Sequence, residues 1–182
     1  LVFAEEQTGG RGRQDRSWYS PAGAGLYCTL VVRPKQPPVF WPLLTHVASV
    51  ALVETIRELA EQKIILSPLD VDLKWPNDVL LSGRKCAGIL LEALVDAARN
   101  AAALVGFGIN VHKGSVPKEL AEEAACLDDM AGAYIPRRQL LTLYLKHFQT
   151  CYLVFEQGRH EEVLNRWKDN SSMWHGATVY IG

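Results

Sequence analysis

The sequence predicts an α+β domain built on mostly antiparallel strands. Between residues 71 and 111, four short apolar segments are separated by Pro-Asn, Ser-Gly-Arg and Asp/Asn turn signals, a spacing typical of hairpins. Residues 42–61 and the region after Pro136 instead place apolar side chains at helical spacing. The 182 residues can bury a sizeable core, which is enough for one domain and the edge of a second.

The first part of the chain is expected to form two strands and one helix. Residues 1–4 are predicted to be a short buried strand. In the strand expected at 25–33, alternate residues face opposite sides, with Leu26, Cys28, Leu30 and Val32 on one of them. An amphipathic helix is expected over about 42–61, and Pro42 is tolerable in its first turn.

The rest of the chain is expected to form four strands followed by helices. The strands are predicted at 71–75, 78–81, 86–94 and 102–111. After residue 117, two short helical pieces lead to a long helix after Pro136, and another helix lies around 160–169. The apolar stripe of the long helix is Leu140, Tyr144, Phe148, Cys151, Tyr152 and Phe155. We place the first domain at 1–170 and the opening strand of a second at 171–182.

The composition excludes some classes of protein. The content of 48% hydrophobic and 21% charged residues is that of a globular chain, and the net charge of −1 argues against a whole-surface nucleic-acid binder. No apolar run is long enough to span a membrane, and no signal peptide is recognisable. The chain starts at Leu1 without a methionine, so we expect a segment upstream of it.

The cysteines predict a reducing environment. Cys28, Cys86, Cys126 and Cys151 are scattered in apolar contexts, without a CxxC pair. Buried free thiols are therefore favoured over disulfides or zinc ligands. We expect a cytoplasmic protein.

The segment Gly9–Arg16 gathers positive charge on a flexible backbone. It holds three arginines and three glycines within eight residues. Arginine offers a planar fork of donors for carboxylate or phosphate, and glycine lets backbone N–H groups approach an anion. A solvated turn or a disordered nucleic-acid tether is the alternative. The flanking strands and nearby Trp18 favour a local clamp for a small anion.

Three further motifs allow both a structural and a functional interpretation. In "LKWPNDVLL" (73–81), Asn77 and Asp78 are turn formers or a polar corner for a phosphate-bound Mg²⁺ or a sugar hydroxyl. Lys85, which precedes an apolar strand, is an edge-strand charge or a functional cation. In "GFGIN" (106–110), the glycines leave one strand face bare, either for close packing or for a ligand.

Taken in order, "EEQTGGRGRQDRSWYS", "LKWPND", "RKCAGILLE" and "GFGINV" resemble the catalytic domain of biotin–protein ligases, over nearly the whole chain. The resemblance implies a mixed sheet flanked by helices, related to class II aminoacyl-tRNA synthetases, followed by a small C-terminal β-barrel. It also implies a reaction in which biotin and MgATP give biotinyl-5′-AMP, and the biotinyl group then passes to a lysine of a biotin carboxyl carrier domain. ATP, Mg²⁺ and biotin are the small molecules it implies.

The resemblance also assigns residues. It implies catalytic roles for Lys85, Arg13 and Arg11, and Asp78 as the metal ligand. The implied biotin and adenylate site is lined by Gln7, Gly10, Arg11, Gly12, Arg13, Lys85, Gly88, Gly106 and Gly108. The implied nucleotide contacts are Arg16, Trp18, Asn77, Asp78 and Asn110. We further expect residues 9–17 to become ordered when biotin or the adenylate binds.

The chain departs from the family pattern, and alternatives remain open. Asp15 stands where the family loop often has glycine, the Ser-Thr-Asn segment expected upstream is missing, and so is most of the barrel. A lipoate or octanoate ligase or transferase is the nearest alternative, and a biotin-sensing transcription repressor core is one of another class. A catalytically inactive relative is a third. A homodimer is left open, and DNA binding would require an N-terminal domain outside these residues.

Overall fold

One antiparallel sheet organises the molecule. The computed structural model describes residues 1–95 and 101–174, in which six strands lie in the order β1-β2-β6-β5-β4-β3. Every pair of neighbouring strands is antiparallel, and for β3 to β6 this is the pairing that the turn signals predicted. The strands are β1 (Val2–Ala4), β2 (Gly25–Val32), β3 (Val71–Lys74), β4 (Asp78–Leu81), β5 (Arg84–Val95) and β6 (Ala101–Asn110).

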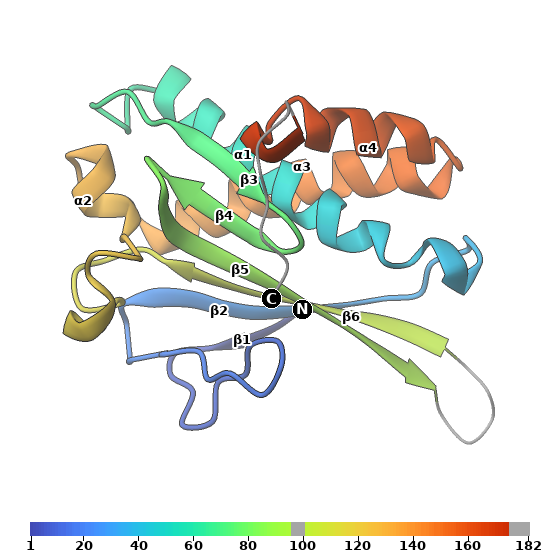
Figure 1. The fold of residues 1–182 in the computed structure, drawn as a ribbon, viewed down its shortest axis with the longest axis horizontal. Coiled ribbons are helices and arrows are strands. Elements are labelled where there is room, and N and C mark those ends of the chain that lie inside the picture. The colour runs from blue at the N-terminus through green and yellow to red at the C-terminus, as the bar shows by residue number, and fades with distance from the viewer. Residues whose placement is uncertain (96–100, 175–182) are drawn as a thin grey trace.

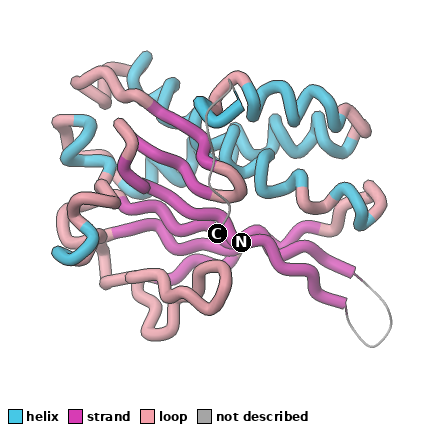
Figure 2. Tube along the Cα trace, in the orientation of Figure 1, coloured by secondary structure: helices cyan, strands magenta, loops and turns pink. Residues whose placement is uncertain are grey.

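Helices cover one face of this sheet and leave the other face to loops (Figure 1). The α-helices are α1 (Leu43–Glu61), α2 (Leu127–Ala131), α3 (Arg137–Glu156) and α4 (His160–Lys168). The helices α3 and α4 pack against α1, which lies on β5 and β6. Short 3-10 turns are η1 (Pro38–Phe40), η2 (Lys118–Leu120) and η3 (Ser172–Trp174). Figure 2 shows the resulting two layers, with long loops gathered at one end of the strands.

The core lies between the sheet and the helices because both present alternate apolar faces. On β6, Val105, Phe107 and Ile109 are buried towards the helices, and Leu44 and Leu59 of α1 are fully buried opposite the sheet. Burial of each such side chain contributes about 1.5–3 kcal/mol. The predicted stripe of α3 is confirmed, since Leu140, Tyr144, Phe148, Cys151 and Phe155 are buried and Tyr152 packs beside them.

The predicted elements agree with the structure to within a few residues, but the burial predicted for the first strand is wrong, because β1 is an edge strand in which Val2 and Phe3 are 61% and 40% exposed. Asp78 is the first residue of β4, in agreement with the strand predicted at 78–81 and not with the turn-former interpretation. Lys85 lies inside β5, because the β4–β5 turn is reduced to Ser82 and Gly83. Both have positive φ, 47° and 79°, which is the geometry of a tight type I′ hairpin. Of the opening strand of a second domain predicted at 171–182, Ser172–Trp174 form the 3-10 turn η3, and residues 175–182 lie outside the described residues.

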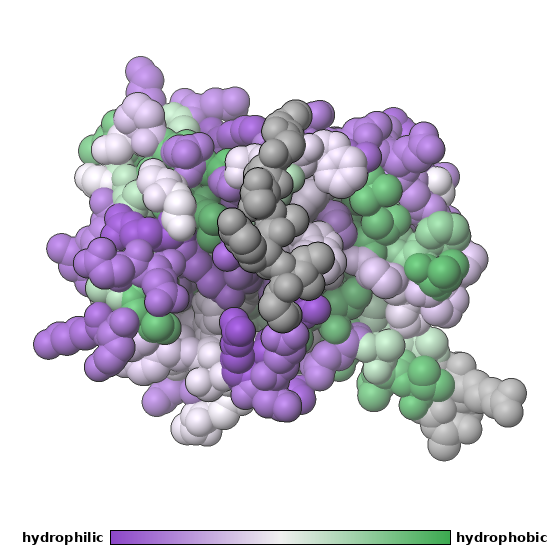
Figure 3. Space-filling view, in the orientation of Figure 1, coloured by the Kyte–Doolittle hydropathy of each residue, from purple (hydrophilic) through white to green (hydrophobic). Residues whose placement is uncertain are grey.

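The remaining features of the fold are the state of its cysteines and the distribution of apolar residues on its surface. All four cysteines are buried free thiols, as predicted. None of the described helices is both long enough and apolar enough to cross a bilayer. Figure 3 shows hydrophilic residues over the segment between β1 and β2, and apolar residues near the far end of β5 and β6. At that end Leu94 and Val95 are 53% and 61% exposed.

Candidate functional site

A cleft of about 1530 Å³ lies on the face of the sheet that the helices leave open. Its walls come from the segment between β1 and β2, from β3 to β6, and from residues 115–124 and 172–174. It brings together nearly every site residue implied by the sequence: Gln7, Arg11, Gly12, Arg13, Arg16, Trp18, Asn77, Asp78, Lys85, Gly88, Gly106, Gly108 and Asn110. Motifs that are up to about a hundred residues apart in sequence therefore share one hollow.

Gly10 is the exception. It is buried beneath the loop, where an added Cβ would lie 2.8 Å from the hydroxyl of Ser20 and 3.0 Å from the amide oxygen of Gln7. That hydroxyl donates a hydrogen bond to Gln7 Oε1 at 2.9 Å. Gly10 thus allows two chain segments to approach closely.

The arginine loop, defined here as residues 9–17, is a small hairpin. The Trp18 N–H donates to the Gly10 carbonyl at 2.9 Å, and the Gly12 N–H donates to the Arg16 carbonyl at 2.7 Å. At its tip Asp15 has a φ of 58°, in the left-handed region that favours glycine. Aspartate tolerates this region better than most residues. Backbone conformation thus gives a reason for glycine at this position in the family pattern, independent of any contact with phosphate.

Lys85 reaches the cleft because of an irregularity in β5. Leu80 of β4 pairs with Lys85, but Val79 pairs with Ala87, so Cys86 is an extra residue at a bulge. In a regular strand Lys85 would share a face with Ala87, which is fully buried against the helices. The bulge places Lys85 on the opposite face. Its backbone is held by hydrogen bonds to Glu123 and from Ala125, at 2.8 and 3.0 Å.

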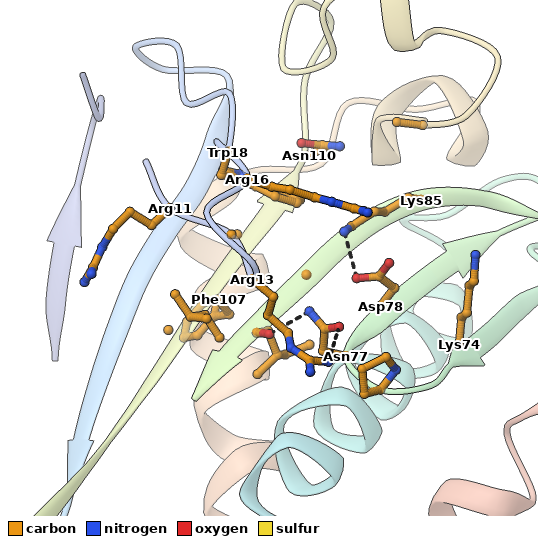
Figure 4. A pocket seen from close by; sticks show the side chains of 18 of the residues that line it. Arg11, Arg13, Arg16, Trp18, Lys74, Asn77, Asp78, Lys85, Phe107 and Asn110 are labelled. Atoms are coloured by element: carbon orange, nitrogen blue, oxygen red, sulfur yellow. Dashed lines mark hydrogen bonds and ion pairs between the residues drawn. The ribbon is translucent and has the colours of Figure 1, made fainter. Parts of the chain in front are cut away.

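The Lys85 ammonium lies between a carboxylate and an aromatic ring. Its Nζ is 2.7 Å from Asp78 Oδ1 (Figure 4). The two opposite charges at this distance form an ion pair. The same Nζ lies 5.4 Å from the centre of the Trp18 ring, within range of a cation–π interaction. The side chain of Lys85 is 35% exposed, so the charge remains accessible to a ligand.

The bare glycine strip accommodates Trp18. A Cβ added to Gly108 would lie 2.5 Å from the indole ring, and one added to Gly88 would lie 3.1 Å from it. Close packing, one of the two interpretations of the "GFGIN" pattern, is therefore confirmed for Gly108. Trp18 Nε1 is buried without an acceptor among residues 1–95 and 101–174. Such an unpaired donor is costly unless another molecule supplies the acceptor.

Asn77 joins the arginine loop to the sheet. Its amide nitrogen donates to the Ile89 carbonyl at 2.9 Å, and the Ile89 N–H donates to the Asn77 carbonyl at the same distance. Its Oδ1 accepts a long hydrogen bond, 3.4 Å, from Arg13 Nη1 (Figure 4). Asn110, at the end of β6, is buried and lines the cleft near Trp18.

Arg11 is not brought to the Lys85–Asp78 pair. Its side chain extends away from Lys85 (Figure 4), and Nη2 lies 3.1 Å from Glu92 Oε2 on β5. The catalytic role implied for Arg11 stays a prediction. Arg13 lies on the side of the loop that faces Asn77, closer to the ion pair in this view.

Sequence reasoning missed one wall of the cleft. Val116, Pro117 and Leu120 line it from the segment after β6, and Leu120 is 44% exposed. Met173 and Trp174 line its other end. The available signal was a group of apolar residues in a polar segment directly after the "GFGIN" motif, which is unusual for a solvated loop.

The donor set limits which metal this cleft can hold. Within residues 1–95 and 101–174, no three His, Cys, Asp or Glu side chains are grouped in a way that could bind a metal ion. Asp78 offers a single carboxylate, and its Oδ1 is already paired with Lys85. Mg²⁺ often needs only one or two carboxylates when phosphates supply the other ligands. The residues fit a metal that accompanies a nucleotide better than a permanent metal centre.

Cys28 also lines the cleft, but it is a poor nucleophile. Burial raises the pKa of this thiol from 9.0 to about 12, and burial raises that of Cys86 to about 12 as well. Both remain protonated at neutral pH, and a protonated thiol is not the reactive form. The site therefore offers cations, a carboxylate and hydrogen-bond donors.

Residues 1–110 match the sequence profile of the Biotin/lipoate A/B protein ligase family, so the chain belongs to this family. The bifunctional ligase/repressor BirA of Bacillus subtilis (strain 168) is 34% identical over 184 residues, covering 100% of this chain and 52% of that protein. The biotin–[acetyl-CoA-carboxylase] ligase of Paracoccus denitrificans is 42% identical over 110 residues, covering 60% of this chain and 43% of that protein.

A solved structure has the same fold. The biotin protein ligase from Aquifex aeolicus, in complex with biotin and ATP, superimposes with a TM-score of 0.76 at 30% identity. The match covers 93% of this chain and 67% of that chain. This chain spans about half the length of the curated relatives that it matches.

Proposed function

We propose that this chain is the catalytic part of an ATP-dependent biotin–protein ligase. It would activate biotin as biotinyl-5′-AMP and transfer the biotinyl group to a lysine of a biotin carboxyl carrier domain. The observation that carries the proposal is the single cleft that unites the arginine loop, the Lys85–Asp78 pair and the glycine strip. The names of the relatives and the biotin and ATP bound to the Aquifex aeolicus enzyme support the same substrates.

The first step joins two anions. A carboxylate oxygen of biotin attacks the α-phosphorus of ATP, a P–O bond forms, and the bond to the pyrophosphate leaving group breaks. Two like charges about 4 Å apart repel by about 4 kcal/mol at an effective dielectric constant near 20. Lys85, Arg13 and Arg16 would offset this repulsion and stabilise the charge that develops on the phosphate.

The cleft also suits the parts of the substrates that do not react. The sheet face at Thr29, Leu90 and Gly106 has small or apolar side chains, which suit the apolar rings and chain of biotin. Val116, Pro117 and Leu120 offer an apolar surface for the adenine base. The unpaired indole N–H of Trp18 would find an acceptor on the bound acid or phosphate. Holding both reactants in one orientation contributes to the rate as well.

Asp78 is the residue proposed to contact Mg²⁺, through the carboxylate oxygen not paired with Lys85. Bound with the nucleotide, Mg²⁺ would supply charge neutralisation at the phosphates. Asn77 and Asn110 are the proposed polar contacts to the nucleotide. No covalent enzyme intermediate is needed, in agreement with the cleft thiol of Cys28, which remains protonated.

In the second step the neutral amine of the carrier lysine attacks the acyl carbon of biotinyl-5′-AMP. A C–N bond forms, the C–O bond to the phosphate breaks, and AMP leaves. The mixed anhydride must be protected from water between the two steps. The glycines of the arginine loop suit a segment that closes over the intermediate.

Lipoate or octanoate transfer is the alternative within the family, because the name of the family covers lipoate ligases as well as biotin ligases. A repressor function is the alternative of another class, since the Bacillus subtilis relative is named a ligase/repressor. That function would require a DNA-binding N-terminal domain outside these residues.

The deciding experiment measures pyrophosphate release by the purified protein with MgATP and biotin, lipoate or octanoate in parallel. It then measures transfer of the acid to a biotin carboxyl carrier domain by intact-protein mass spectrometry. We expect release and transfer with biotin only. Equal rates with lipoate would favour the alternative acid, and absence of release with all three acids would contradict the proposal.

A further inference from the structure

We propose that Glu92 is a positioning residue that fastens the arginine loop across β5 through its ion pair with Arg11. Glu92 is the last residue of the "RKCAGILLE" motif and lies in the second half of β5, but the resemblance assigns it no role. The inference rests on the proposed function, because it assigns Arg11 and Glu92 to closing the site over the substrate. It replaces the expected contact of Arg11 with the reacting atoms.

The loop is attached to the sheet by two arginines that diverge. Arg11 pairs with Glu92 at 3.1 Å, and Arg13 donates to Asn77 at 3.4 Å. Asn77 is itself bonded to the backbone of Ile89, three residues before Glu92 along β5. The two attachments therefore lie at separate points of the same strand, and the loop bridges the surface between them.

A hollow lies under this bridge. It has a volume of about 540 Å³ and is bounded by the arginine loop on one side and by Leu90 and Glu92 on the other. The main cleft shares Leu90 and Glu92 with this hollow. When the loop moves away from β5, both spaces open to solvent together. Glu92 thus controls access to the region proposed to hold biotin.

The position of Glu92 on the strand agrees with this role. Its backbone pairs with Leu104 of β6, and Leu90 precedes it on the same face of β5. Leu90 and Leu104 both line the cleft. The Glu92 carboxylate lies on this apolar strip, and its partner is the guanidinium of Arg11 in the loop, 81 residues away in sequence.

The ion pair between Arg11 and Glu92 is weak enough to break and form again in every catalytic cycle. The side chains of Arg11 and Glu92 are 71% and 41% exposed. An ion pair this exposed contributes little to global stability and is screened by salt. Its loss would shift the balance between open and closed loop without unfolding the domain.

The test compares Glu92→Gln with wild type and with Glu61→Gln, which removes an exposed carboxylate at the end of α1. Biotin dissociation is followed by tryptophan fluorescence, and trypsin cleavage within the loop is followed without ligand. We expect Glu92→Gln to raise both rates about twofold to fivefold. The KM for biotin should rise by a similar factor while kcat for pyrophosphate release stays within about twofold, and Glu61→Gln should resemble wild type.

Two further measurements address the pair itself. The double variant Arg11→Glu/Glu92→Arg should be cleaved by trypsin after Arg13 and Arg16 more slowly than Arg11→Glu alone, because both lack the site at Arg11 and only the double variant restores an ion pair, with reversed charges. Added salt should speed loop cleavage in wild type and leave Glu92→Gln nearly unaffected.

Unchanged dissociation and cleavage in Glu92→Gln would overturn the inference. A lower unfolding temperature with unchanged loop cleavage would also overturn it, by showing that Glu92 acts on strand stability. A wild-type protein that releases no pyrophosphate with biotin would instead contradict the proposed function. The trypsin comparison, which uses no ligand, would still decide whether Glu92 fastens the loop.

Discussion

The substitution Lys85→Met removes the cation at the centre of the proposed site and keeps most of the side chain. Lys85 Nζ lies 2.7 Å from Asp78 Oδ1, and Asp78 is 21% exposed. The Asp78 carboxylate, left without its partner, keeps some contact with water, so we expect the free energy of unfolding to fall by about 1 kcal/mol or less. The effect on the reaction should be much larger, since the repulsion to be offset is about 4 kcal/mol.

If Lys85 supplies between half and all of that compensation, the rate of adenylate formation falls by about thirtyfold to a thousandfold. The assay is pyrophosphate release at saturating biotin and ATP, with circular dichroism as the test of folding. Lys63→Met, which removes an exposed lysine after α1, is the matched control and should behave as wild type. A Lys85→Met variant that releases pyrophosphate within threefold of wild type would refute the role of the ammonium.

Lys85→Arg tests whether charge alone is enough. The space around Nζ is bounded by Asp78 and Trp18, and the Cε atom lies 3.4 Å from where a Cβ of Gly88 would be. A planar guanidinium is larger and has different donor directions. We expect poor rescue, below a tenth of the wild-type rate.

Three other predictions follow from local geometry. Gly108→Ala would place a Cβ 2.5 Å from the Trp18 ring, so the indole must move; we expect biotin to bind about tenfold more weakly in calorimetry, and unaltered affinity would contradict the assignment. Asp15→Gly should retain pyrophosphate release because glycine readily adopts a φ of 58°, whereas a tenfold loss would show that the carboxylate takes part. Tyr144→Phe removes a buried hydroxyl without a partner among the described residues, so urea unfolding should show a gain of about 1 kcal/mol; a loss of that size would reveal a partner.

Local patterns were sufficient for most of the fold. Helical spacing in 42–61 and after Pro136 predicted α1 and α3 to within a residue at their starts, because each helix buries one continuous apolar stripe. Turn signals predicted the antiparallel strands from β3 to β6, since strands joined by a short connection cannot pair in parallel, but the pairing of β2 with β6 had no such signal. The ends of β5 were less predictable, because its first residues are polar and belong to a tight hairpin.

The site was predictable as a set of motifs but not as a geometry. The glycines at 106 and 108 indicated a bare face, while only the structure shows Trp18 lying on it. The partner of Arg11 could not be found from sequence, because the "RKCAGILLE" motif does not indicate that its last residue, Glu92, faces a loop 81 residues away in sequence. Long-range pairs of this kind depend on how the strands are ordered in the sheet.

The direction of the Lys85 side chain shows most clearly which features the sequence determines and which depend on the tertiary structure. The amino-acid order alone sets the apolar periodicity, the hairpin turns and the supply of cations and glycines, because these depend on neighbours along the chain. Regular alternation would have turned Lys85 towards the helices with Ala87. The bulge at Cys86 reverses its direction, and the arginine loop, which lies between β1 and β2 at one edge of the sheet, reaches the same hollow. Only pairing between strands could decide this, because the facing direction of a side chain depends on register with a partner strand.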